Sequence, residues 1–202
     1  WDSRADEATR RSTAAKVSAS LLDAITETGV ADRTILDVGC GIGDLAIEVV
    51  ARGAASGTGF DLSAKAIDEA RKLAQTRGVG NRLRFEVGDG AKLDLPAADI
   101  VVINRVVCCY PDTGNLLERT LGAARSVYAI TAPVSTGAVG ACNRIWNRCW
   151  NVWYRLRRKK FAGFQTFVHD LDGIDERIRA AGFHRVHHEH RRVVWDLAVY
   201  AR

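Results

Sequence analysis

The chain has 202 residues, of which 47% are apolar and 26% are charged. This composition is typical of one globular domain with a sizeable core, and it excludes a disordered or fibrous chain. No apolar run approaches the roughly 20 residues that a membrane span needs, and no signal peptide is visible. The net charge of +5 permits an anionic substrate, a nucleic acid or a lipid surface, and it selects none of them.

The chain contains five cysteines, an odd number whose spacing fits neither a metal site nor a disulfide framework. We therefore expect reduced thiols and a cytoplasmic protein. The first residue is Trp1 and the chain has no methionine, so we expect an initiator region to be missing.

The first predicted element is a helix over residues 2–29, within an N-terminal helical segment 1–31. Its apolar stripe includes Leu21, Leu22 and Ile25 beneath a charged face. Gly29 is placed to end it. Two interpretations stay open for this helix: a packing element before the first strand, or a lid over a ligand.

A strand, a glycine-rich turn and a helix follow in residues 34–50. Ile35 to Val38 is a short apolar run, glycines then alternate with other residues at positions 39, 41 and 43, and an apolar helical pattern begins at Leu45. Such a turn lets the backbone approach a ligand, and the helix presents free N–H groups to it. Asp37, just before the first glycine, disfavours the pyrophosphate of a dinucleotide and suits a cationic ligand.

Two further strands end in carboxylates. Residues 57–62 are predicted as the second strand, and Asp61 at its end is suited to accept both hydroxyls of a ribose. Ser63 is placed to cap the next helix. Residues 82–90 form the third strand and its turn, with Asp89 at the turn.

The fourth strand is predicted at Ile100 to Ile103, continuously apolar as a strand buried on both faces should be. Asn104 and Arg105 break the run at its carboxyl end, where open α/β sheets bind ligands. A helix near residues 116–124 and a strand at 126–131 continue the alternation. These units predict an α/β, Rossmann-like, doubly wound sheet of about seven strands, mostly parallel, with helical lid elements.

No acidic residue lies between Glu118 and Asp170, and this interval holds nine arginines and lysines. Within it Ile145, Cys149, Val152 and Leu156 follow helical spacing, with tryptophans beside them. We interpret residues 134–168 as a basic, aromatic lid insertion. Three roles stay open: packing on the core, covering a substrate, or peripheral contact with a membrane surface through residues 144–160.

The chain closes with a helix over residues 172–181 and two strands within 183–200. Because alternate residues of a strand point to opposite sides, we expect His184, His188 and His190 to share a face with Arg192. This pattern favours a solvated strand, and we predict no metal site.

The run Leu36-Asp-Val-Gly-Cys-Gly-Ile-Gly43 resembles motif I of the class I methyltransferases that depend on S-adenosylmethionine (SAM). Asp61, Asp89 and Asn104 follow in the order of that family, over about residues 33–131. Residues 104–112 and 161–169 are similar to segments of its magnesium-protoporphyrin O-methyltransferase-like group. The resemblance implies one domain over residues 1–202, SAM as the cofactor and a small-molecule acceptor. The residues that it implies for cofactor binding are Asp37, Gly39, Cys40, Gly41, Gly43, Asp61, Leu62, Asp89, Gly90 and Asn104.

Methyl transfer requires the acceptor close to the sulfonium, and an alcohol or amine acceptor also needs a general base. A carboxylate is already ionised, and arginines can hold it, so we favour O-methylation of a small, anionic and partly aromatic acceptor. Candidate catalytic residues are His169, Tyr110 and Arg105. Candidate substrate residues are Arg105, Cys109, Tyr110, Arg144, Arg148, Trp146, Trp150 and His169.

Three other functions compete with this prediction. A SAM-binding protein that catalyses a cyclisation, or one that only regulates, would need the same glycine turn. A nucleic-acid methyltransferase would use the basic segment on phosphates, but no Asp-Pro-Pro-Tyr or Asn-Pro-Pro-Tyr follows the fourth strand, and we expect no nucleic acid partner. Asp37 weakens the case for an NAD-dependent oxidoreductase. The sequence does not indicate an oligomeric state.

Overall fold

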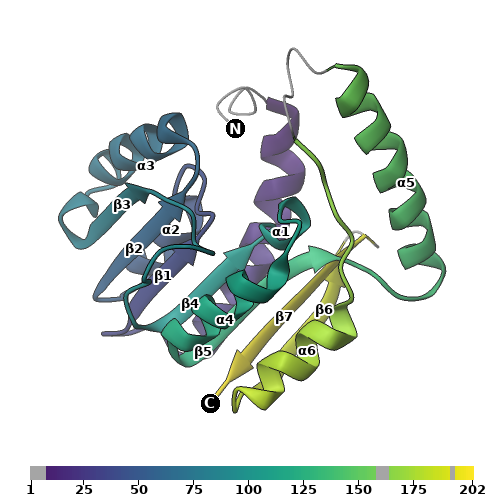
Figure 1. Ribbon diagram of the computed structural model, residues 1–202. Helices are drawn as coiled ribbons and strands as arrows, with labels where there is room; N and C mark the ends of the chain where they lie inside the picture. The colour runs from purple at the N-terminus through teal and green to yellow at the C-terminus, as the bar shows by residue number, and fades with distance from the viewer. Residues whose placement is uncertain (1–7, 158–163, 192–193) are drawn as a thin grey trace.

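Figure 1 shows the computed structural model, which describes residues 8–157, 164–191 and 194–202. Seven strands form one sheet in the order β3-β2-β1-β4-β5-β7-β6. Strands β1 to β5 run parallel to one another, and β7 runs antiparallel to both β5 and β6. This mixed, mostly parallel sheet confirms the predicted fold. The strands are β1 (Thr34–Val38), β2 (Ser56–Asp61), β3 (Leu83–Val87), β4 (Ala98–Asn104), β5 (Ala124–Pro133), β6 (His184–Arg191) and β7 (Trp195–Ala201).

Helices cover both faces of the sheet and divide the core into two layers. One layer packs α1 (Ala8–Glu27), α2 (Asp44–Ala51) and α3 (Ala64–Thr76) against the sheet. The other packs α4 (Thr113–Ala123) and α6 (Leu171–Ala180) on the opposite face. The central strands are buried on both sides, which explains why β4 reads as an unbroken apolar run.

The remaining helix, α5 (Gly137–Leu156), lies outside both layers, at the right of Figure 1. Gly140 is its only buried residue. Ile145, Val152 and Leu156 are 63%, 55% and 80% exposed. Of the three roles left open for this segment, packing of the apolar stripe on the core does not agree with these exposed side chains. The helix that the spacing predicted is present, but its apolar stripe is exposed and points away from the sheet. The basic residues 158–160 and Phe161 lie outside the described residues.

The β6–β7 pair corrects the predicted histidine face. The pairing register shifts between Arg185 and His187, as at a β-bulge. His188 and His190 pair with Ala198 and Asp196, which share one face of β7, whereas His184 pairs with Ala201 on the opposite face. His184 therefore does not share their face, because the extra residue reverses the alternation. Arg192 lies outside the described residues.

Across the part of the chain that the structure describes, we find no helix whose length and hydropathy would suit a membrane crossing.

Candidate functional site

A cavity of about 1320 Å³ opens along the carboxyl ends of the central strands. It lies where β1 and β4 are neighbours and the strand order reverses, the usual ligand position in such sheets. Six of the ten predicted cofactor residues line it, and five of the eight predicted substrate residues do so. The lining residues among these predictions are Gly39, Gly41, Asp61, Leu62, Gly90, Asn104, Arg105, Cys109, Tyr110, Trp146 and Trp150.

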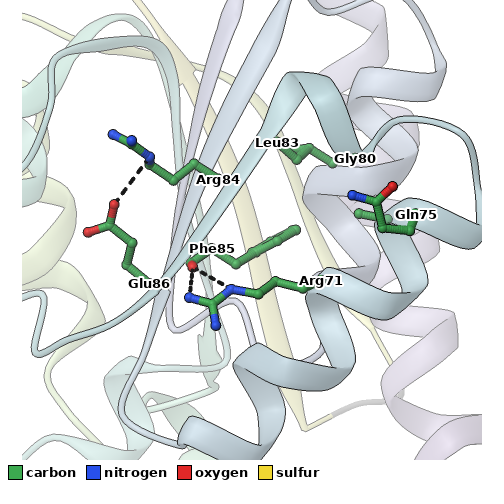
Figure 2. Close-up of a pocket in the computed structure, with 8 residues that line it drawn as sticks. Arg71, Gln75, Gly80, Leu83, Arg84, Phe85 and Glu86 are labelled. Carbon is green, nitrogen blue, oxygen red and sulfur yellow. Dashed lines mark hydrogen bonds and ion pairs between the residues drawn. The ribbon is translucent and has the colours of Figure 1, made fainter.

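A second hollow, of about 400 Å³, lies between α3 and the edge strand β3 (Figure 2). Its charged side chains already have partners in the protein. Arg71 reaches across from α3, and its Nε and Nη2 donate to the Phe85 carbonyl at 3.1 and 2.7 Å. Arg84 pairs with Glu86 at 3.4 Å. None of the predicted site residues lines this hollow, so we assign the ligand site to the larger cavity.

The glycine turn after β1 forms the floor of that cavity. Gly41 has φ of +57°, and a Cβ added to it would meet no atom within 4 Å, because the position opens on the cavity. Gly43 has φ of +78° and is the N-cap of α2. A Cβ on Gly43 would lie 2.7 Å from the ring of Phe85. Gly41 therefore leaves room for a ligand, and Gly43 lets α2 begin close to the sheet.

Asp37 lies behind this turn and is the buried acid of the site. Only 2% of its surface is exposed, and its Oδ1 has no hydrogen-bond partner. Burial, followed by the nearby Asp61 carboxylate, raises the pKa of Asp37 to about 7. A buried carboxylate oxygen without a donor is costly unless a bound group supplies the missing donor or charge.

Asp61, at the end of β2, joins the second strand to the glycine turn. Its Oδ2 accepts from the Gly41 N–H at 2.9 Å, and its Oδ1 accepts from the Ser63 N–H at 2.9 Å. Ser63 in turn caps α3 by accepting from the Ala66 N–H, as predicted. These contacts fix the carboxylate in the wall of the cavity.

Asp89 does not line the cavity, although Gly88 and Gly90 beside it do. Its carboxylate accepts hydrogen bonds from the Ala91 N–H at 3.0 Å and from the Tyr110 hydroxyl, and Lys92 lies 3.2 Å away. Burial raises the pKa of Asp89, but these donors outweigh burial and lower it overall. The sequence suggested no role for Tyr110 as a partner of Asp89.

The candidate catalytic residues occupy different positions. Arg105 and Tyr110 line the cavity, whereas His169 does not. The Nε2 of His169 lies 2.8 Å from the Tyr110 carbonyl oxygen, so this ring orients the loop after β4. Burial, together with the hydrogen bond to Asp89, raises the pKa of Tyr110. The Tyr110 hydroxyl therefore stays protonated at neutral pH and is unsuited to act as a base.

The end of β4 is fixed by two residues that the sequence analysis missed, Ser18 and Thr131. Asn104 donates through Nδ2 to Ser18 Oγ at 2.9 Å and accepts from Thr131 Oγ1 at 2.7 Å. The Arg105 N–H donates to the same Thr131 oxygen at 2.8 Å. Arg105 has φ of +60°, a left-handed conformation that is unusual for a residue with a side chain. The network connects α1, β4 and β5 at the cavity.

The N-terminal helix combines both predicted roles. Leu21 and Ile25 are fully buried in the core. Ser18, Ala19 and Leu22 line the cavity. The helix therefore packs on the sheet with one part of its surface and walls the ligand space with another.

Aromatic side chains form the wall opposite the glycine turn. Trp150 and Tyr154 of α5 are in ring contact, with centroids 5.8 Å apart, and Tyr154 contacts Phe164 at 5.0 Å. Trp146, Trp150, Tyr154, Phe167 and Trp195 line the cavity. Arg144 and Arg148 do not line it. Arg144 donates to the Ser135 carbonyl.

Three asparagines attach α5 to the protein, and their spacing of four residues was a signal that the sequence analysis overlooked. Asn143 donates to the carbonyls of Val134 and Val194 at 2.9 and 3.2 Å. Asn147 and Asn151 each donate to the Thr166 carbonyl at 2.8 Å, and Asn151 accepts from the Thr166 N–H at 2.9 Å. The helix is thus held by polar contacts along one stripe.

His188 and His190 come together with Asp196, across the β6–β7 pair. Their Nε2 atoms lie 2.8 and 3.0 Å from the same Asp196 oxygen. These atom types can bind a metal ion. Both histidines are largely exposed, and none of the three residues lines the cavity.

Three structural features around the glycine turn fit SAM as a ligand. Asp37 supplies a buried carboxylate oxygen that lacks a donor, which a cationic or amine-bearing ligand would satisfy. Gly41 leaves open space at the floor of the cavity. Asp61 supplies a carboxylate at the end of β2, the strand next to β1, and the Gly41 N–H holds that carboxylate in place. Gly41 and Asp61 line the cavity, whereas Asp37 does not line it and lies buried next in sequence to the lining residues Val38 and Gly39. We take these residues as the cofactor side of the site.

Comparison with known proteins agrees with this assignment. A family model described as a methyltransferase domain matches residues 35–127. The ribosomal protein L11 methyltransferase of Pasteurella multocida is 37% identical over 126 residues, which are 62% of this chain and 42% of that protein. The chain therefore spans less than half the length of this relative.

Two solved structures share the fold. The magnesium protoporphyrin IX methyltransferase of Synechocystis, with bound S-adenosylhomocysteine (SAH), aligns with a TM-score of 0.73 and 20% identity. The alignment covers 96% of this chain and 84% of that one. The cyclase SpnF aligns with a TM-score of 0.68 and 18% identity, over 91% of this chain and 80% of that one. Residues 35–127 therefore match a methyltransferase domain, and the chain as a whole shares the fold of solved methyltransferases.

Proposed function

We propose that the chain transfers the methyl group of SAM to a small, partly apolar or aromatic acid, with a carboxylate oxygen as the favoured acceptor. The cavity is the observation that carries this proposal. One continuous space of about 1320 Å³ joins the glycine turn and Asp61 to the aromatic wall. Single-ligand sites commonly measure about 300–1,000 Å³, so this one has room for a cofactor and an acceptor side by side.

Each side of the cavity has a distinct task. Asp37, Gly41 and Asp61 hold the cofactor, which supplies a methyl group on a positively charged sulfur when bound. Trp150 and Tyr154 give the acceptor a flat apolar surface and exclude water from it. Holding the acceptor next to the methyl group supplies much of the rate, because the reaction then becomes effectively unimolecular.

Neither of the two predicted bases is suited to deprotonate an acceptor. The Tyr110 hydroxyl is a poor base because its pKa is raised, and His169 does not line the cavity. No histidine is found among the cavity-lining residues that the structure describes. A carboxylate needs no base, so methylation of an acid is consistent with these residues.

Arg105 is the side chain best placed to hold the acid. It lines the cavity next to Tyr110, and its guanidinium can bind a carboxylate through two parallel hydrogen bonds. Its left-handed backbone, held by Thr131, costs about 1–2 kcal/mol, and strain of this kind is concentrated at functional sites.

The test is transfer of a labelled methyl group from SAM to matched probes: anthracene-carboxylic acid, the corresponding methanol and the corresponding methylamine. We expect the acid to be methylated and Arg105→Asn to lose that activity while keeping SAH binding. Asparagine is the matched replacement because it tolerates φ above zero. Methylation of only the alcohol or amine would contradict the acid acceptor.

Two further probes test the competing functions. Methylation of ribosomal protein L11, the substrate named for one relative, would favour a protein acceptor. SAM binding without transfer to any probe or protein would favour a non-methylating role, such as the cyclisation for which one structural relative is named.

A further inference from the structure

The amphipathic helix α5 is inverted relative to the usual arrangement. A helix on a globular protein normally turns its apolar face to the core and its polar face to water. Here the asparagine stripe at positions 143, 147 and 151 faces the protein and makes the attaching hydrogen bonds. The apolar stripe of Ile145, Cys149, Val152 and Leu156 is exposed.

The two stripes lie on opposite sides of the helix. At 100° per residue, Ile145 is about 160° from Asn147, and Val152 is about 160° from Tyr154. Tyr154 and Asn147 line the cavity, so α5 presents one side to the ligand space and the opposite side to the outside. A helix of 20 residues is about 30 Å long. The exposed stripe, from Ile145 to Leu156, therefore runs along the C-terminal half of the helix, over about 17 Å.

The edges of the apolar stripe carry tryptophan on one side and arginine on the other. Trp146 is 67% exposed, and Arg157 lies over the ring of Trp153 at 5.0 Å. Arg148 and Arg155 fall on the other edge, about 40–80° from Ile145 and Val152. The basic sequence continues beyond the helix with Arg158, Lys159 and Lys160.

We propose that the outer face of α5 binds an anionic membrane surface, with its apolar stripe in the boundary between headgroups and acyl chains. Charge argues against a second copy of the chain, and the composition of this face favours lipid over a protein partner. No acidic residue occurs between Glu118 and Asp170, so nothing on this helix repels an anionic surface, whereas a second copy would present the same positive charge. Exposed aliphatic residues with flanking tryptophan and arginine are the composition of helices that lie in a membrane interface.

Contact of α5 with a membrane would place the cavity next to the lipid in which an apolar acceptor dissolves. The helix that contacts the bilayer is also the helix whose Trp150 and Tyr154 wall the acceptor side. An apolar acid dissolved in the membrane would then enter the cavity beside α5. This consequence rests on the proposed methyl transfer, whereas membrane binding itself does not.

The experiment is flotation of the full chain with vesicles of phosphatidylcholine alone or with 30% phosphatidylglycerol (about one lipid in three, enough for an anionic surface). We expect binding to the anionic vesicles to be at least 10-fold tighter. Ile145→Glu with Leu156→Glu should abolish it. Arg148→Gln with Arg155→Gln should weaken it by roughly 10- to 30-fold, because each basic residue near such a surface contributes about 5-fold.

The matched control is Val186→Glu, which places the same charge at an apolar side chain that is 48% exposed on β6. Each variant is first titrated with SAH, so that loss of the fold or of the cofactor site is detected separately from loss of vesicle binding. The proposal is overturned if the wild-type chain does not float with anionic vesicles, or if the α5 variants bind as Val186→Glu does. It is also overturned if sedimentation shows the stripe to be buried in a dimer that persists with vesicles.

Discussion

The buried carboxylate of Asp37 predicts a proton-coupled binding of the cofactor. Its pKa in the folded chain is about 7, against an ordinary value of 3.8, because of burial and then the neighbouring Asp61. A rise of about three pH units makes the ionised form about 4 kcal/mol less favourable in the fold than in the unfolded chain. With respect to this group, the free energy of unfolding is highest below pH 4 and falls by that amount as the pH rises past 7.

A cationic ligand reverses this preference, because it stabilises the ionised form of Asp37. Without ligand, about one tenth of the chains have ionised Asp37 at pH 6, and about half have it at pH 7. We therefore expect SAM affinity to rise about 10-fold per pH unit below 7 and to level off above it. Binding at pH 6 should release about 0.9 proton per site, and binding at pH 7 about 0.5.

Calorimetric titration at pH 5.5–7.5, in pairs of buffers with different ionisation enthalpies, measures both quantities. Asp37→Asn is the control, because it removes the titrating group and leaves any titration of the ligand itself. The variant should bind with an affinity that hardly changes with pH. Its stability relative to wild type, from urea unfolding, should grow by about 4 kcal/mol between pH 4 and pH 8. An equal pH dependence in both chains, or proton uptake on binding, would refute the reasoning.

Three other substitutions test separate parts of the site, and Gly29→Ala, outside the cavity, serves as the control for the first of them. Gly41→Ala and Gly29→Ala both place a Cβ at positive φ in open space and should each lose about 1–2 kcal/mol of stability, but only Gly41→Ala should weaken SAH binding in calorimetry. Asn104→Ala removes the partner of Ser18 and should lower the free energy of urea unfolding by about 1–3 kcal/mol. Tyr110→Phe should leave the methyl-transfer rate nearly unchanged at every pH, since loss of a general base would cost about 100-fold or more.

Local patterns were sufficient to bring six of the ten predicted cofactor residues to one cavity. The alternating glycines after β1, and Asp61 at the end of β2, are close in sequence to the strands that position them. Parallel strands bring their carboxyl ends to one edge, so the positions of these residues follow from the strand order. The predicted apolar run of β4 was found buried on both faces for the same reason.

The positions of the residues on the proposed acceptor side could not be predicted from the sequence, because they depend on contacts between segments that are far apart in the chain. The stripe at Ile145 and Leu156 predicted an amphipathic helix, but only the fold shows that this stripe faces outward. The hydrogen bonds of Asn147 to Thr166 involve residues 19 positions apart. The bulge after Arg185 added one residue to β6, which removed His184 from the face of His188.

The central claim is that the glycine turn, Asp61 and Asp37 form the cofactor side of the cavity. Its most direct test is calorimetric titration of the wild-type chain and Asp61→Ala with SAH. We predict saturable binding with one site per chain, weakened by about 2–4 kcal/mol in the variant, because a carboxylate that accepts two ligand hydroxyls would be lost. Absence of SAH binding to the folded wild-type chain, or unchanged affinity in Asp61→Ala, would contradict the account.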